Sequence, residues 1–495
     1  MNLRVVPRKN PSIKDNSFHS EHPSIMPSQF AVREHHEFLA ASHEALQSPN
    51  LQLALARLGE TLAVGNRTAF EKLPGSSLLR DKARAIKDEA LAHLDQHIEQ
   101  LERAVKARGG HVHFAADGAE AVAIVHEIIR AAGIKRVVKS KSMVTEEIHL
   151  NRHLEEAGVE VTETDFGEFI IQVAGERPSH LVGPALHKTA EEMAECLNRR
   201  FDQTLTKDPR QMAQFARGLL RKKFAAADMG ITGGNFLIAE TGTVVIISNE
   251  GNARLTTSVP PMMVSLVGIE KIIPRLADLP IFLKVLARAA TGQKMSIYTS
   301  LITGPRKPGE GDGPREFHLV LVDNGRSRIL GGPMRESLFC IRCGACLNAC
   351  PVYRKIGGHA YGGTYSGPIG AVITPLFDGL KENYHQPHAS SLCGACQAAC
   401  PVKIQIPELL IRNRAAQHEQ HVAPRAEELI YKIWSRLMRS PTSYVLMSRT
   451  AARVLSWFAR GGWLSKLPGP LSGWTACRDF PAPARRSFRQ QWREL

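Results

Sequence analysis

Apolar residues recur every three or four positions along the early part of the chain. The clearest stripe consists of Leu79, Ala83, Ile86, Ala90, Leu94, Ile98, Leu101 and Val105. Because this spacing places its members on one face of a helix, residues 36–108 are predicted to be helical. Gly109 and Gly110 follow the stripe, and glycine is typical of the position just past a helix end.

From residue 111 onward, short apolar runs alternate with longer helical segments. Strands are predicted at His111–Ala115, Val137–Lys139, Val159–Thr162, Phe169–Val173, Thr243–Ser248, Ser296–Ile302 and Phe317–Val322. Helices are predicted at Ala119–Ala132, Val144–Ala157 and His187–Phe224. Strands separated by helices favour a mainly parallel sheet covered on both faces, so the predicted fold class is α/β. The last strand is expected at an edge of this sheet.

The chain divides into four predicted parts. Residues 1–70 comprise a polar leader and helices, and residues 71–330 form the α/β domain. A small helical cysteine module follows at 331–415, and a basic, aromatic, helical C-terminal region occupies 416–495. A chain of 495 residues is long enough for several domains that each bury a core.

Composition places the chain among ordinary soluble globular proteins, with 43% apolar and 22% charged residues. No apolar run approaches the roughly 18 residues that a transmembrane helix needs. The first 30 residues are polar and contain no apolar h-region, so no secretory signal is expected there. These features predict a cytoplasmic protein.

The charge is concentrated at the C-terminal end. Residues 421–495 hold 13 Lys and Arg against 4 Asp and Glu, which is +9 of the net +15, and also all five tryptophans. The residues Leu429, Ile430, Ile433, Trp434, Leu437 and Met438 are helically spaced, with basic residues between them. Such a helix can dock a partner protein, pack on the protein's own core, or lie on an acidic membrane surface. Protein packing is favoured over membrane contact, and no nucleic-acid partner is expected.

Seven of the nine cysteines form two motifs in the cysteine module. The first motif is Cys340, Cys343, Cys346 and Cys350, followed by proline, and the second is Cys393, Cys396 and Cys400, also followed by proline. In proteins with two 4Fe-4S clusters, the cysteine before proline ligates the other cluster. We therefore expect two 4Fe-4S clusters, the first bound by Cys340, Cys343, Cys346 and Cys400, and the second by Cys350, Cys393 and Cys396.

Structural zinc is the main alternative for paired cysteines. A zinc site takes four ligands, and it needs neither a third cysteine at this spacing nor a Cys-Pro end in both motifs. The motifs therefore favour iron–sulfur clusters that transfer one electron each. Cys196 and Cys477 stand alone, and Cys196 is interpreted as a core residue.

The second cluster lacks one cysteine in register. When the motifs are aligned on their Cys-Pro ends, Cys340 falls over Ser390. One iron must then take a weaker ligand, such as water, the Ser390 oxygen, His385, His388 or a group from a partner, or else a full ligand arrives from elsewhere, for example Cys196 or Cys477.

Signals in the α/β domain are weaker. The glycine-rich segment 230–235 does not match a dinucleotide fingerprint. The segment Lys139–Ser142 follows a predicted strand and opens a helix, where it either binds an anion or forms a solvated basic turn. Glu240 lies in a turn between apolar runs and is either catalytic or a loop anchor. No catalytic residue is assigned.

Three further segments carry a family resemblance together with the cysteine motifs. They are Phe236–Thr243, Phe317–Gly325 and Tyr365–Pro375. The chain resembles the lactate utilization protein B family from about residue 70 to the C-terminal region. That resemblance implies a LUD domain, similar in fold to CoA-transferases and sugar-phosphate isomerases. It also implies two partner proteins in the oxidation of L-lactate to pyruvate, but it brings no catalytic residue.

The resulting hypothesis is an iron–sulfur electron-transfer subunit of an L-lactate-oxidising oxidoreductase complex, which passes electrons to an acceptor. One rival is the iron–sulfur subunit of another 2-hydroxy-acid oxidase, such as a glycolate-type enzyme. A second rival is a ligand-binding or acyl-transfer LUD enzyme whose clusters are structural. Clusters that a chemical reductant can reduce would favour either electron-transfer hypothesis, and clusters inert to reductants would favour a structural role.

Overall fold

The computed structural model describes residues 35–467, 469–476, 478–484 and 486–492. The predicted polar leader and Cys477 lie outside these residues. The described residues up to Gln417 form one compact unit, and those from His418 onward form a second. Within the described part of the chain, no helix is long and apolar enough to cross a membrane.

The predicted N-terminal helices are confirmed. They are α1 (His35–Gln47), α2 (Pro49–Leu58), α3 (Val64–Glu71), α4 (Ser76–Ala92) and α5 (Leu94–Lys106). The apolar stripe continues from α4 into α5, although the two helices are separated at His93. Its members Ala83, Ala90 and Leu101 are fully buried, as expected for the core face of an amphipathic helix.

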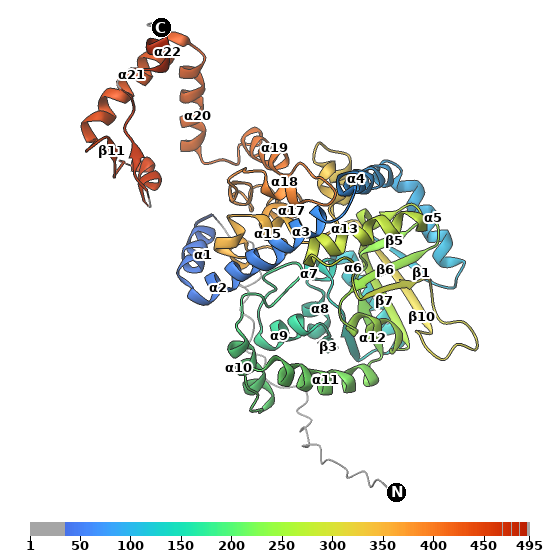
Figure 1. Cartoon of the computed structure of the whole chain (residues 1–495). Helices are drawn as coiled ribbons and strands as arrows, with labels where there is room; N and C mark the ends of the chain where they lie inside the picture. Colours follow the sequence, from blue (N-terminus) through green and yellow to red (C-terminus); the bar gives the residue numbers. More distant parts are fainter. Residues whose placement is uncertain (1–34, 468, 477, 485, 493–495) are drawn as a thin grey trace. The chain divides into compact units, whose positions relative to one another are not determined.

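Six parallel strands form the main sheet, which confirms the predicted α/β class (Figure 1). They run in the order β1 (His111–Ala115), β10 (Glu316–Val322), β7 (Met262–Gly268), β4 (Met229–Thr232), β2 (Arg136–Lys139) and β3 (Glu160–Glu163). Every residue of β7 and β4 is buried, as is typical of parallel strands covered on both faces.

Two strand predictions need correction. The run Phe169–Val173 lies in a helix, α9 (Phe166–Ala174), because the Asp165 side chain caps its first turn and Gly175 ends it in a left-handed conformation. Strand β10 is not an edge strand, since it pairs with β1 on one side and β7 on the other. The edges of the sheet are β1 and β3.

A smaller four-stranded sheet accompanies the main one. It runs in the order β8 (Ile272–Ile273), β5 (Phe236–Ile238), β6 (Thr243–Ser248) and β9 (Tyr298–Ile302). The predicted strands at β6 and β9 exist, but they pair antiparallel with each other and lie outside the parallel sheet. Helix α13 (Leu279–Thr291) packs on this sheet through Phe282 and Phe236, whereas helix α12 (Asn252–Ser258) packs on β4 and β2 of the main sheet.

The remaining predicted helices of the α/β domain are present with breaks. Helix α6 (Gly118–Ala132) is continuous, whereas the predicted 144–157 helix is split into α7 (Met143–Glu147) and α8 (Leu150–Glu156). The predicted 187–224 stretch contains α10 (Ala190–Phe201) and α11 (Pro209–Ala226). Left-handed backbone at His149 and Asp202 interrupts these two segments, because it cannot continue a right-handed helix.

The cysteine module packs directly on the α/β domain. Its helices are α15 (Ala345–Ala349), α16 (Tyr353–Ile356), α17 (Gly367–Asp378), α18 (Ala395–Ala399) and α19 (Ile406–Glu419), of which α15, α17 and α18 gather on one side of the strands (Figure 1). Buried residues of the module, such as Leu347 and Val372, belong to the same hydrophobic core as Phe282 and Leu237 of the α/β domain. The two predicted domains therefore share one core.

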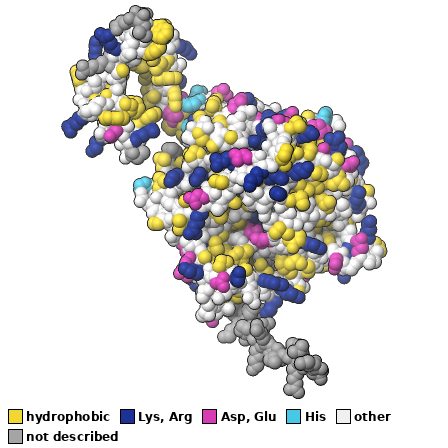
Figure 2. All heavy atoms as spheres, viewed as in Figure 1, with side chains coloured by type: hydrophobic (Ala, Val, Ile, Leu, Met, Phe, Trp, Pro, Cys, Tyr) yellow, Lys and Arg dark blue, Asp and Glu magenta, His cyan; other side chains and the backbone are white. Residues whose placement is uncertain are grey.

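The second unit is small and largely exposed. It contains α20 (Arg425–Met438), α21 (Pro441–Phe458), the strand pair β11 (Trp463–Leu464) and β12 (Phe480–Pro481), and α22 (Phe488–Trp492). The predicted amphipathic helix corresponds to α20, in which no residue is buried. Hydrophobic side chains gather on the surface of this unit (Figure 2), and Ile430 and Trp434 are each more than half exposed.

Candidate metal centre

The two cysteine motifs have the same backbone conformation, fifty positions apart. Arg342 and Leu392, each directly before a cysteine, both have positive φ angles of 58° and 54°. The next glycines, Gly344 and Gly394, are left-handed at 76° and 81°, and each starts a five-residue helix, α15 or α18. Positive φ is uncommon outside glycine, so its repetition at equivalent positions shows that the two loops share one conformation.

Four cysteines from both motifs line one small cavity. They are Cys340, Cys343, Cys346 and Cys400. The rest of its wall is apolar and includes Ile341, Ile369 and Val402. Among the described residues, no three His, Cys, Asp or Glu side chains stand close enough to share a single metal ion. Four thiols around one apolar cavity are the donor set that a cubane cluster needs.

The remaining three cysteines neighbour one another. Burial and then the Cys350 thiol raise the pKa of Cys396 to about 12, and Cys393 adds to that effect. Burial likewise raises the pKa of Cys350, with Cys393 as its charged neighbour. Because burial opposes the thiolate form, metal binding at such thiols must displace protons.

Backbone N–H groups donate to the last cysteine sulfur of each motif. The N–H of Tyr353 donates to Cys350 Sγ at 3.5 Å, and the N–H of Ile404 donates to Cys400 Sγ at 3.4 Å. Hydrogen bonds to cluster sulfurs help to set the reduction potential.

Ser390 takes the place of Cys340 in this repeat. The Arg342 N–H lies 3.4 Å from the Cys340 sulfur, and the Leu392 N–H lies 3.1 Å from the Ser390 hydroxyl oxygen. Cys340 and Ser390, which align in sequence, therefore also occupy equivalent positions in their two loops.

The other candidates for a fourth ligand have different surroundings. His385 stacks on Phe38 with ring centroids 4.9 Å apart, and a ring nitrogen of His388 lies 3.2 Å from the Gln417 side-chain oxygen. Cys196 lies on α10 in the α/β domain.

The two cysteine groups differ in exposure and in nearby charge. Cys393 is exposed, whereas Cys343, Cys346 and Cys400 are buried. Basic side chains surround the first group. Arg342, Lys87 and Lys271 lie near Cys340, and Arg80 lies near Cys400. Burial lowers the pKa of Lys87 to about 7 and that of Lys271 to about 8, so the two arginines carry the more persistent charge. Positive charge beside a cluster favours its reduced form, because reduction adds negative charge.

A buried ion network joins the cysteine module to the α/β domain. Arg326 donates to both oxygens of Glu147 at 2.9 and 2.8 Å, and to Glu270 at 2.6 Å. The hydroxyl of Tyr365 in the module also donates to Glu147, at 2.6 Å. Arg342 stacks over the Tyr365 ring at 4.4 Å. The first cysteine loop is thus tied to the ends of strands in the main sheet.

Lys139 and Glu240, the two candidate residues of the α/β domain, both have partners within the protein. Lys139 is fully buried and paired with Glu163 at 2.7 Å, so it is not available to an external anion. Glu240 accepts the Leu276 N–H at 2.9 Å, which supports the loop-anchor alternative.

The ion network itself was not predicted. Its available signal was the charged pair Glu270 and Lys271 directly after the long apolar run of β7, at the carboxyl end of a parallel strand.

Comparisons with known proteins cover nearly the whole chain. A LUD domain model matches residues 98–322, a 4Fe-4S dicluster domain model matches 336–404, and the model "Lactate utilisation protein B, C-terminal" matches 411–495. Proteins named Lactate utilization protein B are similar throughout. The one from Bacillus velezensis is 46% identical over 91% of this chain and 95% of its own length. The one from Bacillus subtilis is 45% identical, over 88% and 91%. The chain therefore belongs to the lactate utilization protein B family.

Proposed function

We propose that the chain is the iron–sulfur electron-transfer subunit of a complex that oxidises L-lactate to pyruvate. The observation that carries this proposal is the cavity lined by Cys340, Cys343, Cys346 and Cys400, with three more cysteines beside it. Its substrate follows from the name of relatives about 45% identical to this chain. Two partner subunits, an electron acceptor and a cytoplasmic location complete the proposal.

The proposed ligands are crossed between the two motifs. Cys340, Cys343, Cys346 and Cys400 hold the first cluster, and Cys350, Cys393 and Cys396 hold the second. When bound, each cluster accepts and releases one electron at a time. Oxidation of lactate to pyruvate releases two electrons and two protons, so a pair of one-electron carriers suits the reaction.

The two proposed cluster sites differ in the charge around them and in their exposure, which suggests a different role for each. The charged guanidinium groups of Arg342 near Cys340 and Arg80 near Cys400 would favour an electron on the first cluster. The exposed Cys393 brings the second cluster to the surface, where a partner can approach it. The apolar lining of the first cavity excludes water from its cysteines.

The function is tested by isolating the chain with its co-purifying partners under anaerobic conditions and adding L-lactate. Bleaching of the cluster absorbance, and lactate-dependent reduction of an added dye, are the expected results. Reduction by glycolate but not by lactate would identify the glycolate-type rival. Clusters inert even to dithionite would identify a structural role.

Removal of residues 421–495 is expected to leave both clusters in place but to weaken association with the partner subunits. All seven proposed ligands lie in the first compact unit, and exposed aromatic side chains such as Trp434 are typical of interfaces. Iron per chain and partner recovery on co-purification are the two measurements. Loss of iron would show that the C-terminal region supports the cysteine module. Unchanged partner recovery together with lost binding to anionic vesicles would favour the membrane alternative.

Mild oxidation is expected to convert the second cluster, and not the first, to a three-iron form. Ser390 stands where a fourth cysteine would be in this motif, so the fourth iron would lack a local thiolate, and the serine hydroxyl would be a weaker ligand. Electron paramagnetic resonance of briefly air-exposed protein should show the near-isotropic signal of an oxidised three-iron centre. Ser390→Cys should suppress that signal, whereas Ser391→Cys, one residue out of register, should not. Wild-type protein that keeps all its iron and is unchanged by Ser390→Cys would mean that another full ligand exists.

A further inference from the structure

A cavity of about 360 Å³ lies where the α/β domain meets the first cysteine loop. Its polar wall comes from segments just past the carboxyl ends of β2, β4 and β7, the edge where open α/β sheets bind ligands. Arg342 and Cys343 of the cysteine loop close it on another side. The volume falls within the range of small-molecule sites.

Three cationic side chains line this cavity with incomplete pairing. The Lys141 ammonium is buried and makes no hydrogen bond, since its nearest carboxylate oxygen, on Glu168, is 3.6 Å away. One guanidinium nitrogen of Arg342, a side chain 8% exposed, also makes none. Lys271 is 6% exposed, and the carboxylate that attracts it is Glu270, which it shares with Arg326 and Arg342. Buried cations without hydrogen-bonded partners are costly, so an anion here is favoured.

The carboxylates around the cavity do not satisfy these cations. Glu270 is hydrogen-bonded to Arg326, and its other oxygen lies 3.7 Å from Arg342 without a hydrogen bond, while Asp165 accepts the first N–H groups of α9. Burial raises the pKa of Glu168 to about 8, which favours its neutral form near neutral pH, and burial also raises the pKa of Glu250. An excess of positive charge therefore faces the cavity.

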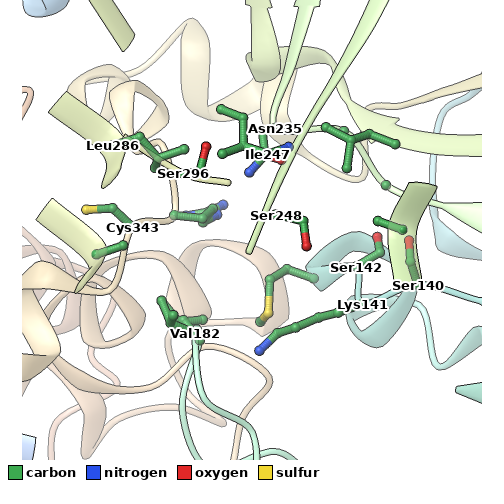
Figure 3. Close-up of a pocket in the computed structure, with 18 of the residues that line it drawn as sticks. Ser140, Lys141, Ser142, Val182, Asn235, Ile247, Ser248, Leu286, Ser296 and Cys343 are labelled. Carbon is green, nitrogen blue, oxygen red and sulfur yellow. Dashed lines mark hydrogen bonds between the residues drawn. The ribbon is translucent and has the colours of Figure 1, made fainter. Parts of the chain in front are cut away.

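The rest of the wall suits a short organic skeleton with a second oxygen. Lys141 extends from the Ser140–Ser142 segment toward Val182, and Ser248 lies above it (Figure 3). The Asn235 side-chain oxygen already accepts the Ile247 N–H at 2.8 Å, which leaves its amide nitrogen to donate. Val182, Ile247 and Leu286 supply apolar surface.

We propose that this cavity binds a small organic acid of the 2-hydroxy or 2-oxo class, with its carboxylate between Lys141 and Arg342. Serine hydroxyls and the Asn235 amide then meet the oxygen at carbon 2. Because Cys343 lines both this cavity and the four-cysteine cavity, the bound acid adjoins the first cluster. The class of acid rests on the proposed function, whereas the excess of unpaired cations does not.

Binding is tested on the full chain with its clusters, kept anaerobic, by titration calorimetry with L-lactate, pyruvate and inorganic phosphate. Lys141→Met should weaken binding of the two organic acids by about 10- to 100-fold, as expected for loss of a charge-assisted hydrogen bond. Lys135→Met is the matched control, because Lys135 is exposed just before the amino end of β2, opposite the carboxyl end that Lys141 follows, and does not line the cavity. Ligand should also alter the paramagnetic spectrum of the reduced first cluster in wild type and Lys135→Met, but not in Lys141→Met.

Three results would overturn the inference. They are no binding of either acid by wild type, binding that Lys141→Met leaves unchanged, and phosphate binding as tight as that of the organic acids. The outcome is separable from that of the proposed function. A complex that reduces its clusters with lactate, although the isolated chain binds neither acid, refutes the site and keeps the function. If the isolated chain binds the acids through Lys141 but the complex is inactive toward lactate, the site is kept and the proposed function is refuted.

Discussion

Replacing Cys400 with alanine is expected to remove the cluster that Cys340, Cys343 and Cys346 hold, although these residues lie more than fifty positions upstream. Cys400 lines the same cavity as those three cysteines, and it is the charged neighbour with the largest effect on the Cys343 thiol. A cubane that loses one of four buried thiolates is left with an iron facing an apolar wall. The expected loss is about half of the iron, or roughly four atoms per chain.

Comparison of paired variants gives this prediction its specificity. Cys400→Ala should leave the same residual paramagnetic spectrum as Cys343→Ala, because both retain only the second cluster. Cys350→Ala should match Cys393→Ala, which retains only the first. Cys196→Ala, on α10 outside the module, serves as the control and should keep full iron. If Cys400→Ala instead resembles Cys393→Ala, each motif holds its own cluster and the crossed scheme is wrong.

Replacement of Arg326 with methionine is expected to lower the free energy of unfolding of the first unit by about 3–5 kcal/mol, the usual effect of removing one partner from a buried ion pair. Arg326 is fully buried and bonds both Glu147 and Glu270. The variant leaves two buried carboxylates without their main cation. Far-ultraviolet circular dichroism in urea measures the change, whereas tryptophan fluorescence does not, because every tryptophan lies in the second unit.

The effect should shrink in acid. Burial alone raises a carboxyl pKa, but Arg326 and its cationic neighbours hold the pKa of Glu270 at about 2. A lowered folded-state pKa stabilises the wild type above the unfolded pKa, and this contribution is lost as pH falls from about 4 toward 2. Without Arg326 the folded-state pKa of Glu270 lies higher, so the variant loses less stability than the wild type over this range and the difference between the two proteins shrinks.

A surface pair provides the matched control for this experiment. Arg67 and Glu71 are 3.9 Å apart, and both side chains are about two-thirds exposed. Arg67→Met should change stability little at any pH, since exposed ion pairs contribute little. An Arg326→Met variant as stable as Arg67→Met would show that the buried network does not hold the two domains together.

Local chemistry was easier to predict than long-range packing. The cysteine motifs are recognisable because cluster ligation imposes its spacing within a few residues. Strand β7 was missed because all its positions are buried, so it lacks the alternation that marks a strand. The run at Phe169–Val173 is apolar enough for either element, and the cap at Asp165 determined its helical form.

The ion network could not be read from the sequence for a different reason. Tyr365 and Glu147, which share a hydrogen bond, are 218 positions apart. The Lys139–Ser142 segment is recognisable in the sequence as a candidate anion site. The geometry at the end of β2 determines whether Lys139 or Lys141 can reach an anion. Lys139 ends β2 inside the domain with its own carboxylates, while Lys141, two residues later, faces the cavity.

The continuous core beneath the clusters has a consequence for protein engineering. Ferredoxin-like modules are often considered for transfer into other enzymes as electron carriers. This module, however, has no separate core from that of the α/β domain. Cys343 and Cys346 count among the same buried residues as Leu237 and Phe282 of the α/β domain. A fusion that cuts near Gly331 would expose that core on both pieces. The natural point for grafting a foreign partner is after Gln417, where the first compact unit ends.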